Sequence, residues 1–344
     1  MSLADAVLAL LVASLCAYVV LAGADFGAGV WELTTLGSRE GARVREAIHR
    51  SVGPVWEANH VWLIFVLVIL WTGFPTAFSS IVSTLAIPLF LAALGIIFRG
   101  TAFAFQPHIV GRRATRIVSV LFGVSSVLTP FVMGAAVGGI ASGRVPVGNA
   151  AGEPFGSWLN PTSAFIGVLA VALGAYLAAV YLAADAARAG AADLSEAFRR
   201  RALLAGAAAG GLAIGGLLVV RADPAPLWNG LSGAGAPLVI ASGVAGIATL
   251  ALVASRRFGV ARIGAAGAVG AVVIGWAVAQ RPELLPGQLT VDAAAAGRST
   301  LIALLVGVGV GALVLIPSLA WLFRLTLAGT LAKGVAPSDA GAGE

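Results

Sequence analysis

The stretch SVGPVWEANHVWLIFVLVILW, residues 51–71, joins the signature of a membrane span to side chains that a bilayer disfavours. Its second half is a continuous apolar run, and about 20 such residues cross the hydrocarbon core of a membrane. Its first half carries Glu57, Asn59 and His60. Polar and ionisable groups inside a span are costly, so each of them is a candidate for function.

The composition of the whole chain agrees with a membrane protein. Hydrophobic residues make up 59% of the 344 residues and charged residues only 10%, and the mean hydropathy is +0.99. Soluble proteins carry about 25% charged residues. The net charge of +6 says little about nucleic acid, because basic residues in such a chain usually mark cytoplasmic loops, and we expect no nucleic-acid partner. Cys16 is the single cysteine, so an internal disulfide is excluded.

Nine segments are long and apolar enough to span a membrane. They are residues 3–24, 54–73, 80–104, 117–140, 160–184, 202–220, 236–254, 261–279 and 300–323. With the N-terminus outside and the C-terminus in the cytoplasm, most of the 21 basic residues fall in cytoplasmic segments, as the positive-inside rule requires. The sequence therefore predicts an all-α polytopic protein with one integral membrane domain over residues 1–330. Residues 331–344 are predicted to form a disordered cytoplasmic tail.

Three charged residues are expected at similar depth near the inner surface, on consecutive spans. Asp25 ends the first predicted span, Glu57 begins the second and Arg99 lies near the inner end of the third. Such a cluster could pass protons inward from the cytoplasm, or it could be a structural ion pair that locks three helices. Asp25 could also be a solvated helix end, and Glu57 a first-turn carboxylate favoured by the helix dipole.

The neighbours of these charges suggest close helix packing. Gly23 and Gly27 form a small-xxx-small pair that lets another helix approach beside Asp25. Asn59 is expected to point to another side of its helix than Glu57, toward a hydrogen bond between helices. Glu32 lies seven residues after Asp25, on the same face if the helix continues.

Histidines are few, and no pair of them has ligand spacing. His60 shares a face with Glu57, and a histidine packed in the core is the simpler reading of it. The others, His49 and His108, lie in or near predicted loops. We therefore expect no haem or metal site in this chain.

Three motifs together resemble subunit II of cytochrome bd-type quinol oxidases. They are GADFGAG at the end of the first span, GPVWEANHVWLI at the start of the second and FRGTAFAF at the end of the third. The resemblance is strong over residues 15–106 and diffuse beyond them. It implies two four-helix bundles plus one peripheral helix, in a bacterial cytoplasmic (inner) membrane.

The same resemblance implies a role in a larger oxidase. The partner, subunit I, would hold haems b and d and the site for quinol, and the complex would reduce dioxygen to water. A small single-span accessory subunit, membrane lipid and quinone are further possible partners. By motif position, Asp25 and Glu57 would carry protons toward the partner. The supporting residues by the same argument are Trp56, Asn59, His60 and Arg99.

Two departures and one alternative accompany this interpretation. Ala24 stands where the family usually has a phenylalanine. Many members of the family have an acid five residues after the motif arginine, where this chain has Ala104, so the proton route is shorter or altered here. The alternative is a proton-coupled secondary transporter, which the intramembrane acids and interrupting glycines would suit. Transporters often carry inverted repeats and mid-membrane sites, whereas here the charges gather at one surface and no repeat is evident.

Overall fold

The computed structural model describes residues 2–36, 39–53, 56–106, 109–223 and 225–327, and they are almost entirely helical. Nine of the helices in these ranges are long and apolar enough to cross a membrane, which confirms the predicted number of spans. They are α1 (Leu3–Thr34), α3 (Trp56–Gly73), α5 (Ala86–Phe105), α6 (Arg112–Ala141), α7 (Pro161–Arg188), α8 (Ala192–Ala222), α10 (Ala236–Ala254), α11 (Phe258–Gln280) and α13 (Arg298–Leu327). The predicted tail over residues 331–344 lies outside the described ranges.

The first, third and sixth spans differ most from their predicted bounds, and the sixth, α8, begins at Ala192 instead of near residue 202. Helix α1 does not end near residue 24 but continues to Thr34, so Asp25 lies inside it. The predicted span 80–104 is divided at Leu85 into α4 (Pro75–Thr84) and α5. Pro88 explains the division, because in a continuous helix its ring would clash with the carbonyl of Thr84, four residues earlier.

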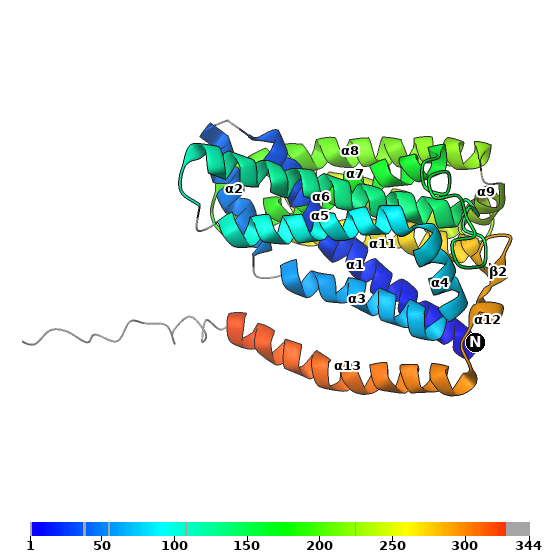
Figure 1. Cartoon of the computed structure of the whole chain (residues 1–344). Coiled ribbons are helices and arrows are strands. Elements are labelled where there is room, and N and C mark those ends of the chain that lie inside the picture. Colours follow the sequence, from blue (N-terminus) through cyan, green and yellow to red (C-terminus); the bar gives the residue numbers. More distant parts are fainter. Residues whose placement is uncertain (1, 37–38, 54–55, 107–108, 224, 328–344) are drawn as a thin grey trace, which may run out of the picture.

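A helix also occupies part of the predicted loop 25–53. Helix α2 (Arg39–Val52) is amphipathic: Val44, Ile48 and Val52 are buried, whereas Glu46 and Arg50 are exposed. Its apolar side packs on α1 and α7, so α2 covers the end of the helix packing where α1 stops. In Figure 1, α2 lies at one end of the molecule.

The opposite end holds the N-terminus and the remaining short elements. These are α9 (Ala225–Ser232), the antiparallel strands β1 (Glu283–Leu285) and β2 (Leu289–Thr290), and α12 (Val291–Ala294). Figure 1 shows them together at the end away from α2. Leu285, Val291 and Ala294 are buried in one apolar cluster with Val7 of α1 and Phe74, so this loop is packed onto the helix ends away from α2.

Helix α1 lies at the centre of the helix packing, and α13 lies at its edge. Helix α1 contacts α3, α6, α7 and α11, whereas the main contacts of α13 are with α3 and α1, and it stands apart in Figure 1. Glycines bring α1 and α7 together: a Cβ on Gly27 would lie 1.9 Å from the carbonyl oxygen of Gly174. The predicted close approach of a helix beside Asp25 is therefore confirmed.

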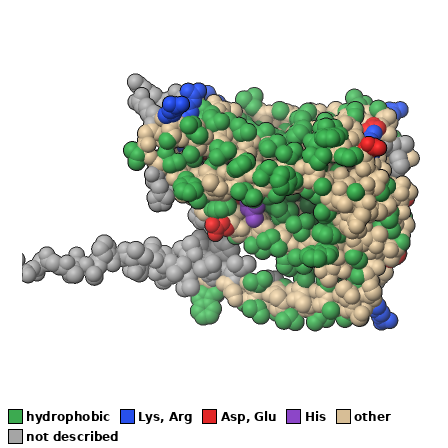
Figure 2. Space-filling model, viewed as in Figure 1, with side chains coloured by type: hydrophobic (Ala, Val, Ile, Leu, Met, Phe, Trp, Pro, Cys, Tyr) green, Lys and Arg blue, Asp and Glu red, His purple; other side chains and the backbone are tan. Residues whose placement is uncertain are grey.

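The surface between the two ends is apolar. Hydrophobic side chains cover the middle of the face in Figure 2, and lysines and arginines appear near its ends. Large exposed hydrophobic side chains occur on most spans, among them Ile64, Ile97, Ile214 and Ile247. A continuous apolar surface of this kind suits contact with lipid or with another membrane subunit.

Candidate functional site

Asp25 is the centre of a buried polar site among four helices. Its residue is 4% exposed, and the side-chain amide of Asn59 on α3 donates a hydrogen bond to its Oδ2. The alternative of a solvated helix end is therefore wrong for Asp25. The predicted helix–helix hydrogen bond of Asn59 is confirmed, and its acceptor is this carboxylate.

Arg99 of α5 brings a positive charge to the same site. It is 1% exposed, its Nη2 donates to the backbone carbonyl of Asp25 at 3.0 Å, and its Nε donates to Oγ of Ser126 on α6 at 3.1 Å. The rings of Phe26 and Phe122 each lie 4.9 Å from its Cζ atom. A buried cation is tolerable only with such partners, and the neighbouring carboxylate compensates for its charge.

Small residues allow these helices to come this close. A Cβ on Gly29 of α1 would lie 2.2 Å from Oγ of Ser126, and one on Gly95 of α5 would lie 2.2 Å from Oγ1 of Thr129. Gly29 is one turn after Asp25, and Gly95 is one turn before Arg99. The same glycines that pack α1 and α5 on α6 therefore determine how close the carboxylate of Asp25 comes to the guanidinium of Arg99.

The remaining predicted residues surround this site without joining it. Glu57 lies in the first turn of α3 and is exposed. Of the predicted cluster of Asp25, Glu57 and Arg99, the structure therefore brings together only Asp25 and Arg99. The Nδ1 atom of His60 lies 2.8 Å from the carbonyl of Trp56, and its ring meets Phe26 edge-on at 5.8 Å. His60 is therefore packed among aromatic side chains, as the simpler interpretation of it expected.

A second buried acid was not among the predicted site residues. Glu32, two turns after Asp25 on α1, is fully buried, and its Oε2 lies 3.3 Å from Nε2 of His49 on α2. His49 in turn contacts Phe103 and Phe122 with its ring. The amphipathic spacing of Val44, Ile48 and Val52 was the signal that could have placed His49 against α1 rather than in a loop.

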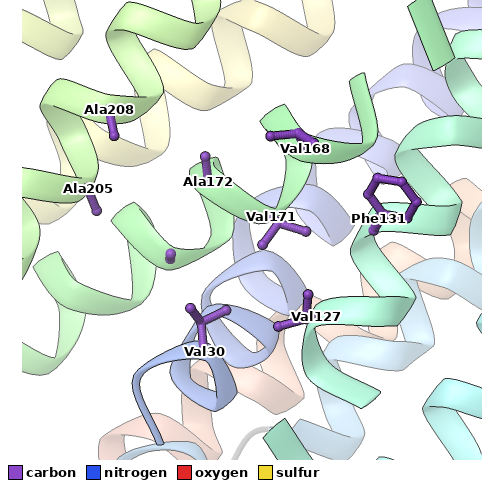
Figure 3. Close-up of a pocket in the computed structure, with 9 residues that line it drawn as sticks. Val30, Val127, Phe131, Val168, Val171, Ala172, Ala205 and Ala208 are labelled. Atoms are coloured by element: carbon purple, nitrogen blue, oxygen red, sulfur yellow. The ribbon is translucent and has the colours of Figure 1, made fainter. Parts of the chain in front are cut away.

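An apolar pocket of about 370 Å³ opens between α1, α6, α7 and α8. In Figure 3, Val30, Val127 and Val171 point toward one another across it. It is lined only by apolar side chains, so it offers no group for chemistry. No group of three or more potential metal-ligating side chains occurs within the described residues.

Comparison with known proteins gives a consistent picture. Residues 3–326 match the family model described as cytochrome bd terminal oxidase subunit II. The chain is 29% identical over 117 residues to a cytochrome bd ubiquinol oxidase subunit 2 of Bacillus subtilis, and 27% identical over 170 residues to the cytochrome bd-I ubiquinol oxidase subunit 2 of Escherichia coli K12. These matches cover 34% and 46% of this chain, and only 34% and 42% of the two relatives.

A solved structure extends the likeness over nearly the whole chain. A chain from the structure of bd oxidase from Geobacillus thermodenitrificans superposes with a TM-score of 0.76 at 25% sequence identity. The match covers 95% of this chain and 99% of that one.

Proposed function

Because the chain belongs to the cytochrome bd terminal oxidase subunit II family, we propose that it is the second subunit of a complex that oxidises quinol and reduces dioxygen to water. The nine apolar helices and the family make it a multi-pass protein of the bacterial inner membrane. Its partner is then a subunit I that holds haems b and d and the quinol site. The exposed apolar surface leaves room for this partner, for lipid and quinone, and for a small accessory subunit.

In the proposed topology the N-terminus is outside and the α2 end of the molecule faces the cytoplasm. The distribution of basic residues along the sequence supports this orientation. One integral membrane domain then consists of two four-helix bundles, α1, α3, α5, α6 and α7, α8, α10, α11, with α13 at the periphery. The contacts of α7 with α8 and α11, and of α10 with α8 and α11, support the second bundle.

The specific task of this subunit, in our proposal, is to supply cytoplasmic protons to the partner. The observation that carries it is the buried contact of Asp25 with Asn59 beside the guanidinium of Arg99. The Asn59 amide holds Oδ2 of Asp25, which leaves Oδ1 to take up and release a proton. The charge of Arg99 compensates for the carboxylate whenever the proton has left.

Glu57 has a separate part in this route. It is exposed at the start of α3, two residues from the Asn59 that binds Asp25. An exposed carboxylate collects protons from water, whereas a buried one passes them on. Nothing in this arrangement favours the transporter alternative.

The test compares two isosteric variants in the assembled complex. Asp25→Asn removes the buried proton carrier and Glu57→Gln the exposed one. We expect Asp25→Asn to lower oxygen uptake at saturating quinol about tenfold or more with an intact haem spectrum, and Glu57→Gln to lower it less. Glu153→Gln is the control, because Glu153 is an exposed acid of the loop after α6. Wild-type turnover of Asp25→Asn would rule out the proposed route, and loss of haem in either variant would assign that residue to assembly.

A further inference from the structure

Glu32 is a buried acid that the proposed route does not use. Its side chain has no exposed surface, and neither carboxylate oxygen receives a hydrogen bond from the residues that the structure describes. An ionised carboxylate in this state would be costly, because burial removes its water and no donor replaces it. The nearest basic group is His49, whose Nε2 is 3.3 Å from Oε2.

His49 is placed between this acid and water. Its side chain is 20% exposed, while the ring is held by Phe103 at 5.1 Å and Phe122 at 5.5 Å between ring centroids. Helix α2 turns its other side to solvent, where Arg50 pairs with Glu46. An imidazole has two ring nitrogens that can each bind a proton, so a ring in this position can exchange protons with water on one side and with a carboxylate on the other.

Glu32 is also connected to the site around Asp25. The two acids are seven residues apart on one face of α1, which is about 10 Å along the helix axis. Arg99 interacts electrostatically with both of them. The ring of Phe122 on α6 contacts both Arg99 and His49. One side chain therefore borders both the Asp25–Arg99 site and the Glu32–His49 pair.

Within the described residues, the charged and titratable groups near Glu32 are therefore few. They are His49 of α2, Arg99 of α5 and Asp25 of its own helix, while α6 contributes Phe122 and Ser126.

We propose that Glu32 and His49 form a second proton-carrying pair, which takes protons from the cytoplasmic side and delivers them toward Asp25. In the step itself, the Nε2–H bond of the imidazolium breaks and an O–H bond forms on Oε2 of Glu32. Both groups become neutral, and the ring is protonated again from water. This inference rests on the proposed function, since it adds a branch to the same proton supply at a position where no motif led to it.

The experiment uses the purified complex with its haem-bearing partner. Glu32→Gln removes the carrier with little change in volume, and His49→Ala opens a space for added imidazole. We expect both variants to lower oxygen uptake at saturating quinol severalfold and to raise the solvent deuterium isotope effect, with the KM for quinol unchanged. Added imidazole should restore turnover in His49→Ala. Glu32→Asp, which keeps a carboxylate, should retain part of the turnover that Glu32→Gln loses. Glu46→Gln on the exposed side of α2 is the matched control.

The outcomes separate this inference from the function on which it rests. If Asp25→Asn slows turnover while Glu32→Gln and His49→Ala run at the wild-type rate, the second pair is overturned and the proposed function stands. If Asp25→Asn is itself normal, the proposed function fails. If Glu32→Gln does not assemble, His49→Ala decides, because a defect that imidazole leaves unchanged is structural and overturns the pair.

Discussion

Arg99 is the largest side chain that the fold buries completely. Several fixed partners, rather than a single ion pair, compensate for burying its charge. Its guanidinium reaches a carbonyl of α1 and a hydroxyl of α6 at the same time, and two phenyl rings flank it. A planar fork with several fixed donors is suited to this task, and an ammonium group is not.

Arg99→Lys should therefore fail although it keeps the charge. Lysine cannot bind Ser126 and the Asp25 carbonyl from one rigid plane, so a buried charge would lose partners, at a cost of about 3–5 kcal/mol. The measurement is the yield and melting temperature of the purified complex. Arg200→Lys is the control, since the Arg200 side chain is 75% exposed and pairs with Glu196 on the surface. Equal stability of both variants would show that the fork geometry of Arg99 is unimportant.

The sequence predicted most of this site but not its inner arrangement. Asp25, Asn59 and Arg99 were identified, and they are in contact. Glu57 was expected beside them and is exposed, because successive helix residues differ by about 100° in direction and the rotation of α3 is fixed only by packing. Glu32 and His49 meet only because α2 folds back onto α1, a contact between elements that no local pattern reports.

Among the helices, the crossing of α1 and α7 depends on two glycines. The Cβ of any residue at position 27 would lie 1.9 Å from the carbonyl oxygen of Gly174, so the two helices would have to separate. Asp25 is two residues from this crossing, and its place among the neighbouring helices depends on it.

Gly27→Ala should therefore destabilise the protein by about 1–3 kcal/mol and lower turnover as well. The reason is overpacking at the α1–α7 crossing, and thermal unfolding of the purified protein measures it. Gly210→Ala on α8 is the matched control, because nothing lies within 4 Å of the added Cβ there and alanine favours the helix. A neutral Gly27→Ala would mean that α1 and α7 separate freely.

Span existence was predictable and span limits were not. About 20 apolar residues suffice to identify a span, and all nine were found. Helix α1 runs ten residues beyond the predicted end, since Asp25 and Glu32 are accommodated by neighbouring helices instead of by water. The division at Leu85 could have been found, because Pro88 was visible in the sequence.

On the scale of the whole molecule, a polar contact ties three helices together at the end away from α2. Asp223, which caps α8, accepts hydrogen bonds from Arg144 after α6 and from Thr162 at the start of α7, each at 2.7 Å. The hydrogen bond from Arg144 lowers the pKa of Asp223 below its ordinary value of 3.8.

This pKa gives a sign for the dependence of stability on pH. A carboxylate with a lowered pKa stabilises the fold above the unfolded value of 3.8, and its contribution is lost as the pH falls through the folded value. We expect the melting temperature of the wild type to fall as the pH drops below about 5, and Asp223→Asn to begin lower and fall less. Asp193→Asn removes the more exposed pair with Arg43 and should change little. An unaltered pH profile in Asp223→Asn would show that this contact does not stabilise the end of the molecule away from α2.

The marginal position of α13 has a consequence for how the protein is made. The loop before it is already fixed, because Leu285, Val291 and Ala294 pack against earlier helices at the end away from α2. Chains leave the ribosome from the N-terminus and fold as they emerge. The first eight spans and the loop after α11 can therefore complete their packing in the membrane while α13 is still being synthesised. The last span to be inserted is the one on which the assembly of the others depends least.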